Sequence, residues 1–306
     1  MFSYRHGFHA GNHADVLKHM VLIAVLKHLT QKDTALTVID THAGAGLYRL
    51  DGDYAVASGE VDDGIFKLFN ALAPAPPARP ALKAIAPAVS DYLEMIAGFN
   101  APGELTIYPG SPFVVQRLLR ESARDKLKLF ELHPVDGKSL AANIAQLKAG
   151  RQVSVAREDG FEGLKAFLPP PARRALVLID PSYEIKNDFG KVAACIQDSL
   201  KRFATGTYAV WYPVIPRHEA HDLPRRLKTL ATQAGKPWLH ATLAIGQREE
   251  KAVAGEAERR PGLTASGMFI INPPHPLKSA LQAALPQLLE VLGRGRGKAQ
   301  ALEHGG

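Results

Sequence analysis

The sequence has 306 residues, of which 46% are hydrophobic, so it is long enough for one large α/β domain with an insertion or for two domains. It has no run of about 18 apolar residues and no basic-then-apolar order at its start, so we expect a cytoplasmic protein without a membrane span or an export signal. The single cysteine, Cys195, excludes an intrachain disulfide framework, and the net charge of +7 is compatible with a polyanionic partner.

Residues 1–13 combine aromatic, imidazole and guanidinium groups with two glycines and show no apolar periodicity. We interpret this segment as an arm that recognises nucleic acid. Tyr4 and Phe8 can stack on bases, and Arg5 can contact phosphate. His6 belongs to the same cluster, so Tyr4, Arg5 and His6 are the candidate contacts to the substrate.

Two other interpretations of this arm stay open. His9 and His13 are four residues apart and can belong to a metal site, although no cysteine or carboxylate completes a familiar ligand spacing. The segment can also be an ordinary piece of surface. We expect no metal.

Apolar residues recur at helical spacing from Ala14 to Leu29, which predicts a helix with Lys18 and His19 near its N-terminal end, where both can face a ligand. A buried strand at 36–40 follows and leads into the glycine-rich turn 41–46. This turn lacks the full dinucleotide fingerprint. An acid followed by Ala-Gly-Ala-Gly instead resembles the first motif of methyltransferases that use S-adenosylmethionine, with Gly44 of this turn as a candidate cofactor contact.

Residues 51–105 interrupt the alternation of strands and helices. Two helical patterns, at 64–72 and 88–99, are separated by a proline-rich stretch at 74–80 that can be neither helix nor central strand. We therefore predict a small helical insertion, either a lid or RNA-facing element or a passive decoration.

Three residues at the ends of the next elements can bind a nucleoside. Ser111 follows a turn and either contacts a ligand or caps the next helix. Glu131 lies near the end of a predicted strand at 127–133, where an acid can bind ribose hydroxyls. Asp159 and Gly160 follow a third strand at 153–156, so Asp159 can accept a hydrogen bond from an adenine, although Asp-Gly is also a common turn.

The fourth strand, 175–179, ends in Asp180-Pro181-Ser182-Tyr183. An exocyclic amine is a poor nucleophile because its lone pair is delocalised into the base. The Asp180 carboxylate and the Pro181 carbonyl can accept its two hydrogens, and Tyr183 can stack on the flipped base. Taken alone, Asp-Pro after an apolar strand is more often an ordinary turn.

Further strands at 206–214, 239–245 and 268–271 complete the prediction. The fold class is α/β: a Rossmann-like class I methyltransferase with a seven-stranded, mostly parallel sheet, helices on both faces and a helical insertion. We expect one domain from residues 1–50 and 106–292, the insertion at 51–105 and a flexible Gly/Arg/Lys-rich tail at 293–306.

Several long strings resemble the RlmJ family of 23S rRNA adenine N6-methyltransferases. The resemblance covers nearly the whole chain except the insertion and the tail. The strings that carry it are Ser3-Tyr4-Arg5-His6, Phe8 to His19, Asp40 to Gly46, Tyr108 to Pro112, Glu131 to Pro134, Arg202 to Ala209 and Trp211-Tyr212-Pro213.

This resemblance implies a monomeric cytoplasmic enzyme that needs no metal and no obligatory protein partner. It would methylate one adenine of 23S rRNA, adenine 2030, before the ribosome is assembled. Asp180 would be the catalytic acceptor and Tyr4 an RNA contact. The S-adenosylmethionine contacts would be His19, His42, Ser111, Glu131, Asp159 and Gly160, with Lys18 and Asp180 as further candidates.

The chain departs from the family at one catalytic position, where Ser182 replaces the second proline of Asp-Pro-Pro-Tyr. Serine loosens this turn, but it removes neither the carboxylate nor the carbonyl. The same four residues also serve DNA adenine N6-methyltransferases, which is one alternative. A noncatalytic RNA-binding protein that retains the fold is another, and a nicotinamide dehydrogenase is disfavoured by the spacing of the glycines.

Overall fold

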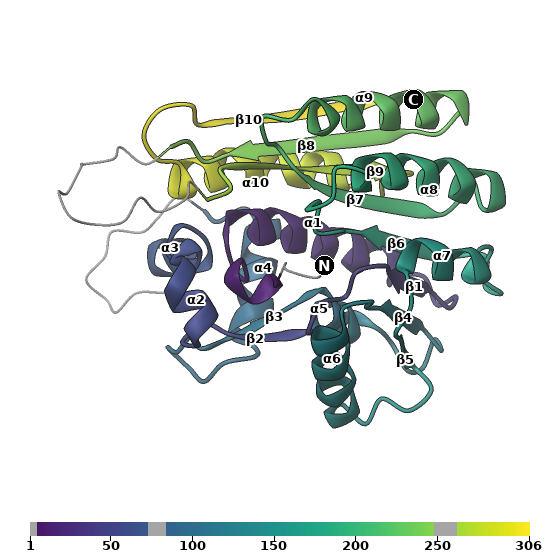
Figure 1. Ribbon diagram of the computed structural model, residues 1–306, viewed down its shortest axis with the longest axis horizontal. Coiled ribbons are helices and arrows are strands. Elements are labelled where there is room, and N and C mark those ends of the chain that lie inside the picture. Colours follow the sequence, from purple (N-terminus) through teal and green to yellow (C-terminus); the bar gives the residue numbers. More distant parts are fainter. Residues whose placement is uncertain (1–4, 73–83, 248–261) are drawn as a thin grey trace.

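The centre of the structure is an eight-stranded sheet with strand order β10-β8-β9-β7-β6-β1-β4-β5 (Figure 1). The computed structural model describes residues 5–72, 84–247 and 262–306. Within them, no helix is long and apolar enough to cross a membrane.

Five neighbouring strands run parallel, and the apolar runs of the sequence explain why. All five residues of β6 are buried, as expected for a strand covered on both faces. Because these strands share a direction, their carboxyl ends meet at one edge of the sheet. The strands are β1 (Thr37–Asp40), β4 (Lys126–Phe130), β5 (Val153–Ala156), β6 (Ala175–Ile179) and β7 (Thr207–Pro213).

The other three strands are antiparallel to their neighbours: β8 (Trp238–Ala244), β9 (Ala265–Ile271) and β10 (Ala299–Gly305). The predicted sheet lacks one strand. Part of the segment 293–306, predicted to be a flexible tail, forms β10, which pairs with β8 over seven residues. Most β10 side chains are exposed, so the segment has no buried face for an apolar pattern to reveal. Its backbone covers the edge of β8.

Helices cover both faces of the sheet (Figure 1). Inward-pointing side chains of the strands alternate between two separate hydrophobic clusters, one under each layer. The first layer contains α1 (His13–Leu29), α4 (Pro87–Ala97), α5 (Ser111–Leu118), α6 (Pro134–Gln146) and α10 (Leu277–Leu292). The second contains α7 (Gly160–Gly163), η3 (Leu164–Phe167), α8 (Asp188–Arg202) and α9 (His218–Gln233).

Helix α1 is buried on nearly all sides, with 13 of its 17 residues inaccessible to solvent. It packs against α4, α5, α10 and β9, so it has no face left for water. Asn12 caps the helix by accepting hydrogen bonds from the backbone N–H groups of Ala14 and Asp15. The buried polar side chains all lie in its N-terminal half, which adjoins the edge of the sheet described above.

The inserted region begins and ends at neighbouring points, because β2 (Leu47–Arg49) pairs antiparallel with β3 (Ile107–Pro109). Between them lie α2 (Asp53–Ser58), η2 (Glu60–Asp63), α3 (Ile65–Leu72) and α4. The predicted helices at 64–72 and 88–99 are confirmed as α3 and α4, and the proline-rich stretch lies outside the described residues. Leu68 and Tyr92 belong to the same hydrophobic cluster as α1, so these helices share the main core.

This shared core makes the insertion part of one cooperative unit. Replacing the fully buried Leu68 by alanine should lower the free energy of unfolding by about 2–5 kcal/mol. Both tryptophans, Trp211 and Trp238, lie on the main sheet, so their fluorescence reports on the sheet alone. For Leu68→Ala we expect the midpoint of the urea unfolding transition, followed by tryptophan fluorescence, to shift to a lower urea concentration. Leu132→Ala, at a half-exposed position, is the control. An unchanged fluorescence transition would show that the insertion unfolds independently.

Candidate functional site

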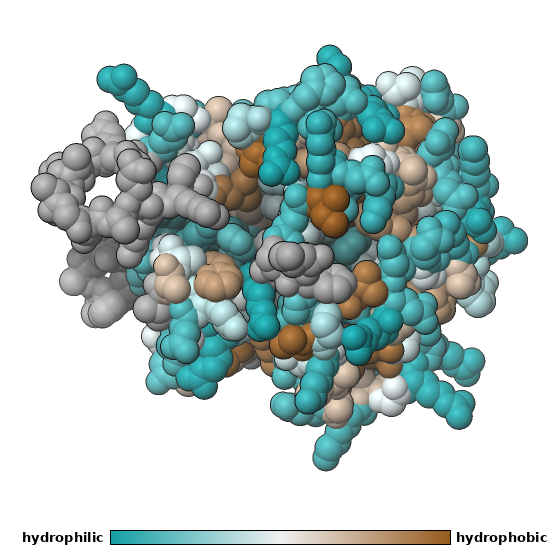
Figure 2. All heavy atoms as spheres, viewed as in Figure 1, coloured by the Kyte–Doolittle hydropathy of each residue, from teal (hydrophilic) through white to brown (hydrophobic). Residues whose placement is uncertain are grey.

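A cavity of about 380 Å³ lies at the carboxyl ends of the parallel strands. The face in Figure 2 is mostly hydrophilic, with apolar side chains in small groups. Two of the few large apolar side chains that are exposed, Leu132 and Ile185, line this cavity. The cavity also gathers eleven predicted site residues: His6, Lys18, His19, His42, Gly44, Ser111, Glu131, Asp159, Gly160, Asp180 and Pro181.

The glycine-rich turn after β1 holds Glu131 in place at the end of β4. Its carboxylate accepts hydrogen bonds from the backbone N–H groups of Gly44, at 2.8 Å, and His133, at 2.7 Å. Gly44 has a φ of +61°, and a Cβ at this position would lie 2.3 Å from the Tyr48 hydroxyl. Burial raises the pKa of Glu131, although the two backbone hydrogen bonds oppose that shift.

Asp159 and Gly160 form the neighbouring wall. The Asp159 carboxylate caps α7 by accepting a hydrogen bond from the Phe161 N–H at 2.9 Å. A Cβ on Gly160 would lie 1.9 Å from the Thr41 carbonyl oxygen, so only glycine fits where α7 approaches the exit of β1. His42 packs edge-to-face on Phe161, with ring centroids 4.8 Å apart, and burial lowers the pKa of His42 to about 4.

Ser111 is the first residue of α5, and Gly110 occupies the N-cap position. The capping role considered for Ser111 is therefore wrong. Its hydroxyl instead donates to the Asp40 carboxylate at 2.7 Å, and the His42 N–H donates to the same carboxylate at 3.3 Å. Asp40 is fully buried, and this burial raises its pKa to about 6. The sequence places Asp40 as the acid before the glycine-rich turn, but it does not predict the hydrogen bond from Ser111.

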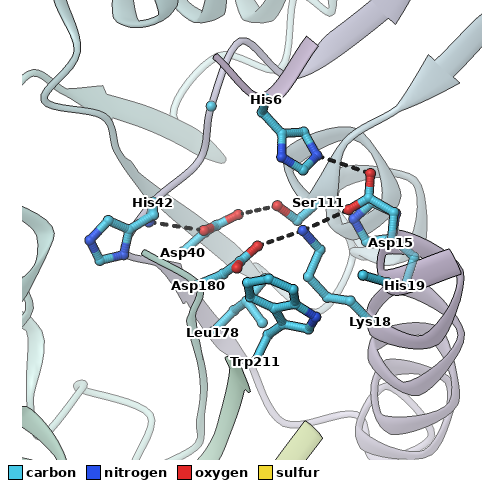
Figure 3. Close-up of polar contacts among 12 residues, drawn as sticks. His6, Asp15, Lys18, His19, Asp40, His42, Ser111, Leu178, Asp180 and Trp211 are labelled. Carbon is cyan, nitrogen blue, oxygen red and sulfur yellow. Dashed lines mark hydrogen bonds and ion pairs between the residues drawn. The ribbon is translucent and has the colours of Figure 1, made fainter. Parts of the chain in front are cut away.

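A second polar network joins α1 to the end of β6 (Figure 3). The Lys18 ammonium contacts the Asp180 carboxylate at 2.5 Å and the Asp15 carboxylate at 2.9 Å. Asp15 also binds the His6 imidazole at 2.9 Å and accepts from the Gly11 N–H at 3.0 Å. The Lys18 ammonium lies 5.8 Å from the centre of the Trp211 ring. Asp15 is therefore a site residue that sequence analysis does not identify.

Charge compensation decides the ionisation of this network. Burial alone would lower the pKa of Lys18, but attraction by Asp15 and Asp180 outweighs it and raises that pKa above its usual value. Burial would raise the pKa of Asp15, yet the nearby His6 and Lys18 hold it well below the usual range. Both groups are therefore charged at neutral pH.

Two predicted residues lie elsewhere. Tyr183 does not line the cavity. Its ring is 3% exposed, packs on Phe189 and Trp211, and donates its hydroxyl proton to the Trp211 carbonyl at 2.6 Å. Arg5 turns toward α2, where it donates to the Tyr54 hydroxyl at 3.1 Å. Tyr4 lies outside the described residues.

Acids outnumber cations in the cavity wall: six carboxylates face two lysines. Such a wall suits a cationic or hydrogen-bond-donating ligand better than a polyanion. Among the described residues, no three His, Cys, Asp or Glu side chains are grouped as a metal ion requires. The acids are Glu131, Asp136, Asp159, Asp180, Glu184 and Asp188, and the lysines are Lys18 and Lys191.

Comparison with known proteins now assigns the chain to a family. The sequence model of the family described as "Ribosomal RNA large subunit methyltransferase D, RlmJ" matches residues 33–302. The chain belongs to the RlmJ family. Its large, mostly parallel sheet with helices on both faces is the α/β architecture expected from the sequence.

Relatives in the RlmJ family match over nearly their whole length. The ribosomal RNA large subunit methyltransferase J of Escherichia coli K12 is 41% identical over 94% of this chain and 93% of its own. The protein of the same name from Haemophilus influenzae is 40% identical over 95% and 94%. A crystal structure of a Legionella pneumophila protein superimposes with a TM-score of 0.78 at 31% identity and covers 97% of this chain and 98% of its own.

The buried carboxyl of Asp40 should make the stability of the protein depend on pH. Its folded pKa, about 6, lies above the ordinary value of an aspartate, so the folded state binds the proton more tightly. This contribution to stability is present below about pH 4 and is lost as the pH rises through 6. Asp40→Asn removes the penalty, so urea unfolding should show the variant gaining up to about 3 kcal/mol relative to wild type between about pH 4 and pH 7.5. Parallel pH profiles of the two proteins would contradict the assignment.

Proposed function

We propose that this protein transfers a methyl group from S-adenosylmethionine to the exocyclic N6 amine of an adenine in 23S rRNA, with adenine 2030 as the expected nucleotide. The observation that carries the proposal is the position of Asp180. Its carboxylate follows β6 and lines the same cavity as Glu131 and Asp159, the two acids expected to bind a nucleoside. Membership of the RlmJ family supports the same reaction class.

The cavity wall fits S-adenosylmethionine. Glu131 has lone pairs left after its two backbone contacts and can accept from ribose hydroxyls. Asp159 can accept from the adenine amine, and Gly160 lines the same cavity beside it. The excess of acids complements a sulfonium charge. His19, His42, Ser111, Gly44 and Lys18 would complete the binding site.

The residues around Asp180 prepare the amine. S-adenosylmethionine, when bound, supplies an electrophilic methyl group. Lys18 occupies Oδ2 of Asp180, which leaves Oδ1 and its lone pairs for one amine hydrogen. The Pro181 carbonyl can accept the other, so the nitrogen lone pair is localised for attack. Because Lys18 is itself held by Asp15, the carboxylate is fixed in position before a base arrives.

The charge distribution supports entry of a base rather than of a phosphate. The chain carries a net charge of +7, yet six acids and two lysines line the cavity. A polyanion is attracted to the basic surface, whereas an uncharged base can enter an acidic pocket once it is flipped out of its stack. The exposed side chains of Leu132 and Ile185 provide apolar contact at the cavity wall. Action on free rRNA in the cytoplasm, as a monomer, remains part of this proposal.

The structure changes how Tyr183 enters the mechanism. As described, its ring supports the segment after Asp180 through Phe189 and Trp211 and offers no face to the cavity. We therefore assign base contact at this stage to the cavity wall and keep Asp180 and Pro181 as the catalytic pair. Ser182 is exposed at the cavity wall.

Asp180→Asn keeps the shape of the side chain but removes its charge. We expect methyl transfer from labelled S-adenosylmethionine to 23S rRNA to fall by about two orders of magnitude or more, because a positioned acceptor is lost. Binding of S-adenosylhomocysteine, measured by calorimetry, should change little. Asp198→Asn, which only disturbs an exposed ion pair with Arg202 on α8, is the matched control. Normal turnover by Asp180→Asn would refute the mechanism.

DNA adenine methylation is the alternative that the same catalytic residues allow. Labelled methyl transfer into naked 23S rRNA and into DNA, at equal concentrations of adenine, separates the two. We expect RNA to be preferred at least about tenfold, with the label recovered as N6-methyladenosine. Preference for DNA would overturn the substrate assignment. Absence of any S-adenosylmethionine binding would instead favour a noncatalytic RNA-binding protein.

A further inference from the structure

Three buried polar side chains form a hydrogen-bonded chain behind the cavity. The His19 Nδ1 atom lies 2.9 Å from the Tyr108 hydroxyl oxygen, and that oxygen lies 3.2 Å from the hydroxyl of Tyr92. All three side chains are fully buried. His19 and Tyr108 also stack, with ring centroids 5.5 Å apart. His19 alone of the three lines the cavity.

The direction of these hydrogen bonds follows from counting protons. A hydroxyl has one proton to donate, and a neutral imidazole donates from one nitrogen and accepts at the other. If Nδ1 of His19 carried the proton, Tyr108 would donate to Tyr92, and the Tyr92 proton would be buried without an acceptor among the described residues. In the opposite order Tyr92 donates to Tyr108, and Tyr108 donates to Nδ1. Each order leaves one buried proton without an acceptor among the described residues. In this second order it is the proton on Nε2 of His19, the one side chain of the three that lines the cavity, where a ligand can accept it.

The remaining proton of His19 is then on Nε2. This atom is buried and has no hydrogen-bond partner in the part of the chain that the structure describes. Nδ1 and Nε2 point in diverging directions, so Nε2 is turned away from Tyr108. Burial lowers the pKa of His19 to about 3, hence the ring is neutral at physiological pH. The side chain therefore presents one N–H donor and no charge.

We propose that Tyr108 and Tyr92 are positioning residues that hold His19 as the neutral Nε2–H tautomer, a donor for an anionic group of the cofactor. This inference rests on the proposed cofactor site. The acids Glu131 and Asp159 can accept from the ribose and the adenine, whereas the methionyl carboxylate requires donors. A neutral N–H donor meets that requirement without adding a second buried cation beside Lys18, which is already shared by Asp15 and Asp180.

The hydrogen-bonded chain Tyr92–Tyr108–His19, called the relay below, also gives the insertion a role. Tyr92 lies on α4, inside the predicted insertion, and Tyr108 lies on β3, where the chain returns to the main fold. The hydrogen-bonded chain therefore starts at Tyr92, a donor from the insertion, and ends at His19, an acceptor in the cavity wall. The insertion thus acts on the cofactor site through two hydroxyl groups and is more than a decoration.

The tautomer can be measured without a cofactor. We expect the 15N spectrum of the ligand-free protein, with His19 assigned by comparison with His19→Asn, to show Nε2 as the protonated nitrogen and Nδ1 as the unprotonated one. Titration with S-adenosylhomocysteine should shift the Nε2 resonance and leave the tautomer unchanged. An Nδ1–H tautomer, or a His19 ring charged at neutral pH, would overturn the inference.

Hydroxyl deletions test the order of the relay. Tyr108→Phe should weaken S-adenosylhomocysteine binding by about tenfold, since Nδ1 loses its donor, and Tyr92→Phe by about threefold, since Tyr108 keeps its bond to His19. The matched control is Tyr208→Phe, whose fully buried hydroxyl donates to the Ser199 and Phe203 carbonyls in the other hydrophobic cluster. Equal effects of all three variants would reduce the relay to general packing and refute it.

The two proposals fail in different ways. If the protein methylates RNA but His19 is an Nδ1–H tautomer, only the relay is wrong. If the tautomer is as expected but S-adenosylhomocysteine does not bind, the proposed cofactor fails and the positioning of His19 stands as a property of the fold.

Discussion

The ammonium of Lys18, buried between two carboxylates, is the interaction on which the site depends. Asp15 binds it from one turn earlier on α1, and Asp180 binds it from the end of β6. Removing Asp15, the fully buried partner, would cost about 3–5 kcal/mol, because it would leave an uncompensated charge. The contact therefore fixes α1 against the sheet edge, and through Asp15 it also holds His6.

Helix α1 transmits this arrangement because it is enclosed on nearly all sides. Asp15 and Lys18 of this helix form the ion pairs, and His19 connects the same helix to Tyr108 and Tyr92. A helix surrounded by apolar neighbours cannot turn to expose those groups without opening the core. The polar residues of α1 are thus both the most constrained part of the helix and the part that faces the cavity.

Much of the fold was predictable because the pattern of apolar residues in a segment indicates which of its faces are buried. The run 175–179 is apolar throughout and lies at the centre of the sheet, whereas β10 has mostly exposed side chains and depends on the free edge of β8. Site residues that follow strands were predictable for a related reason, since parallel strands bring their ends together. Tyr183 was not, because its ring orientation depends on Phe189 and Trp211, which are neighbours only in space.

The sequence by itself determined seven of the eight strands of the main sheet in chain order, the family resemblance and the acids and glycines that follow β1, β4, β5 and β6. These features are local, because each depends on residues close together in the chain. Only the tertiary structure decided that Asp15 and Lys18 meet Asp180, that Ser111 donates to Asp40, and that Tyr92 of the insertion reaches His19. These contacts join segments far apart in the chain, and their partners are selected by packing and charge compensation, which no short string of residues encodes.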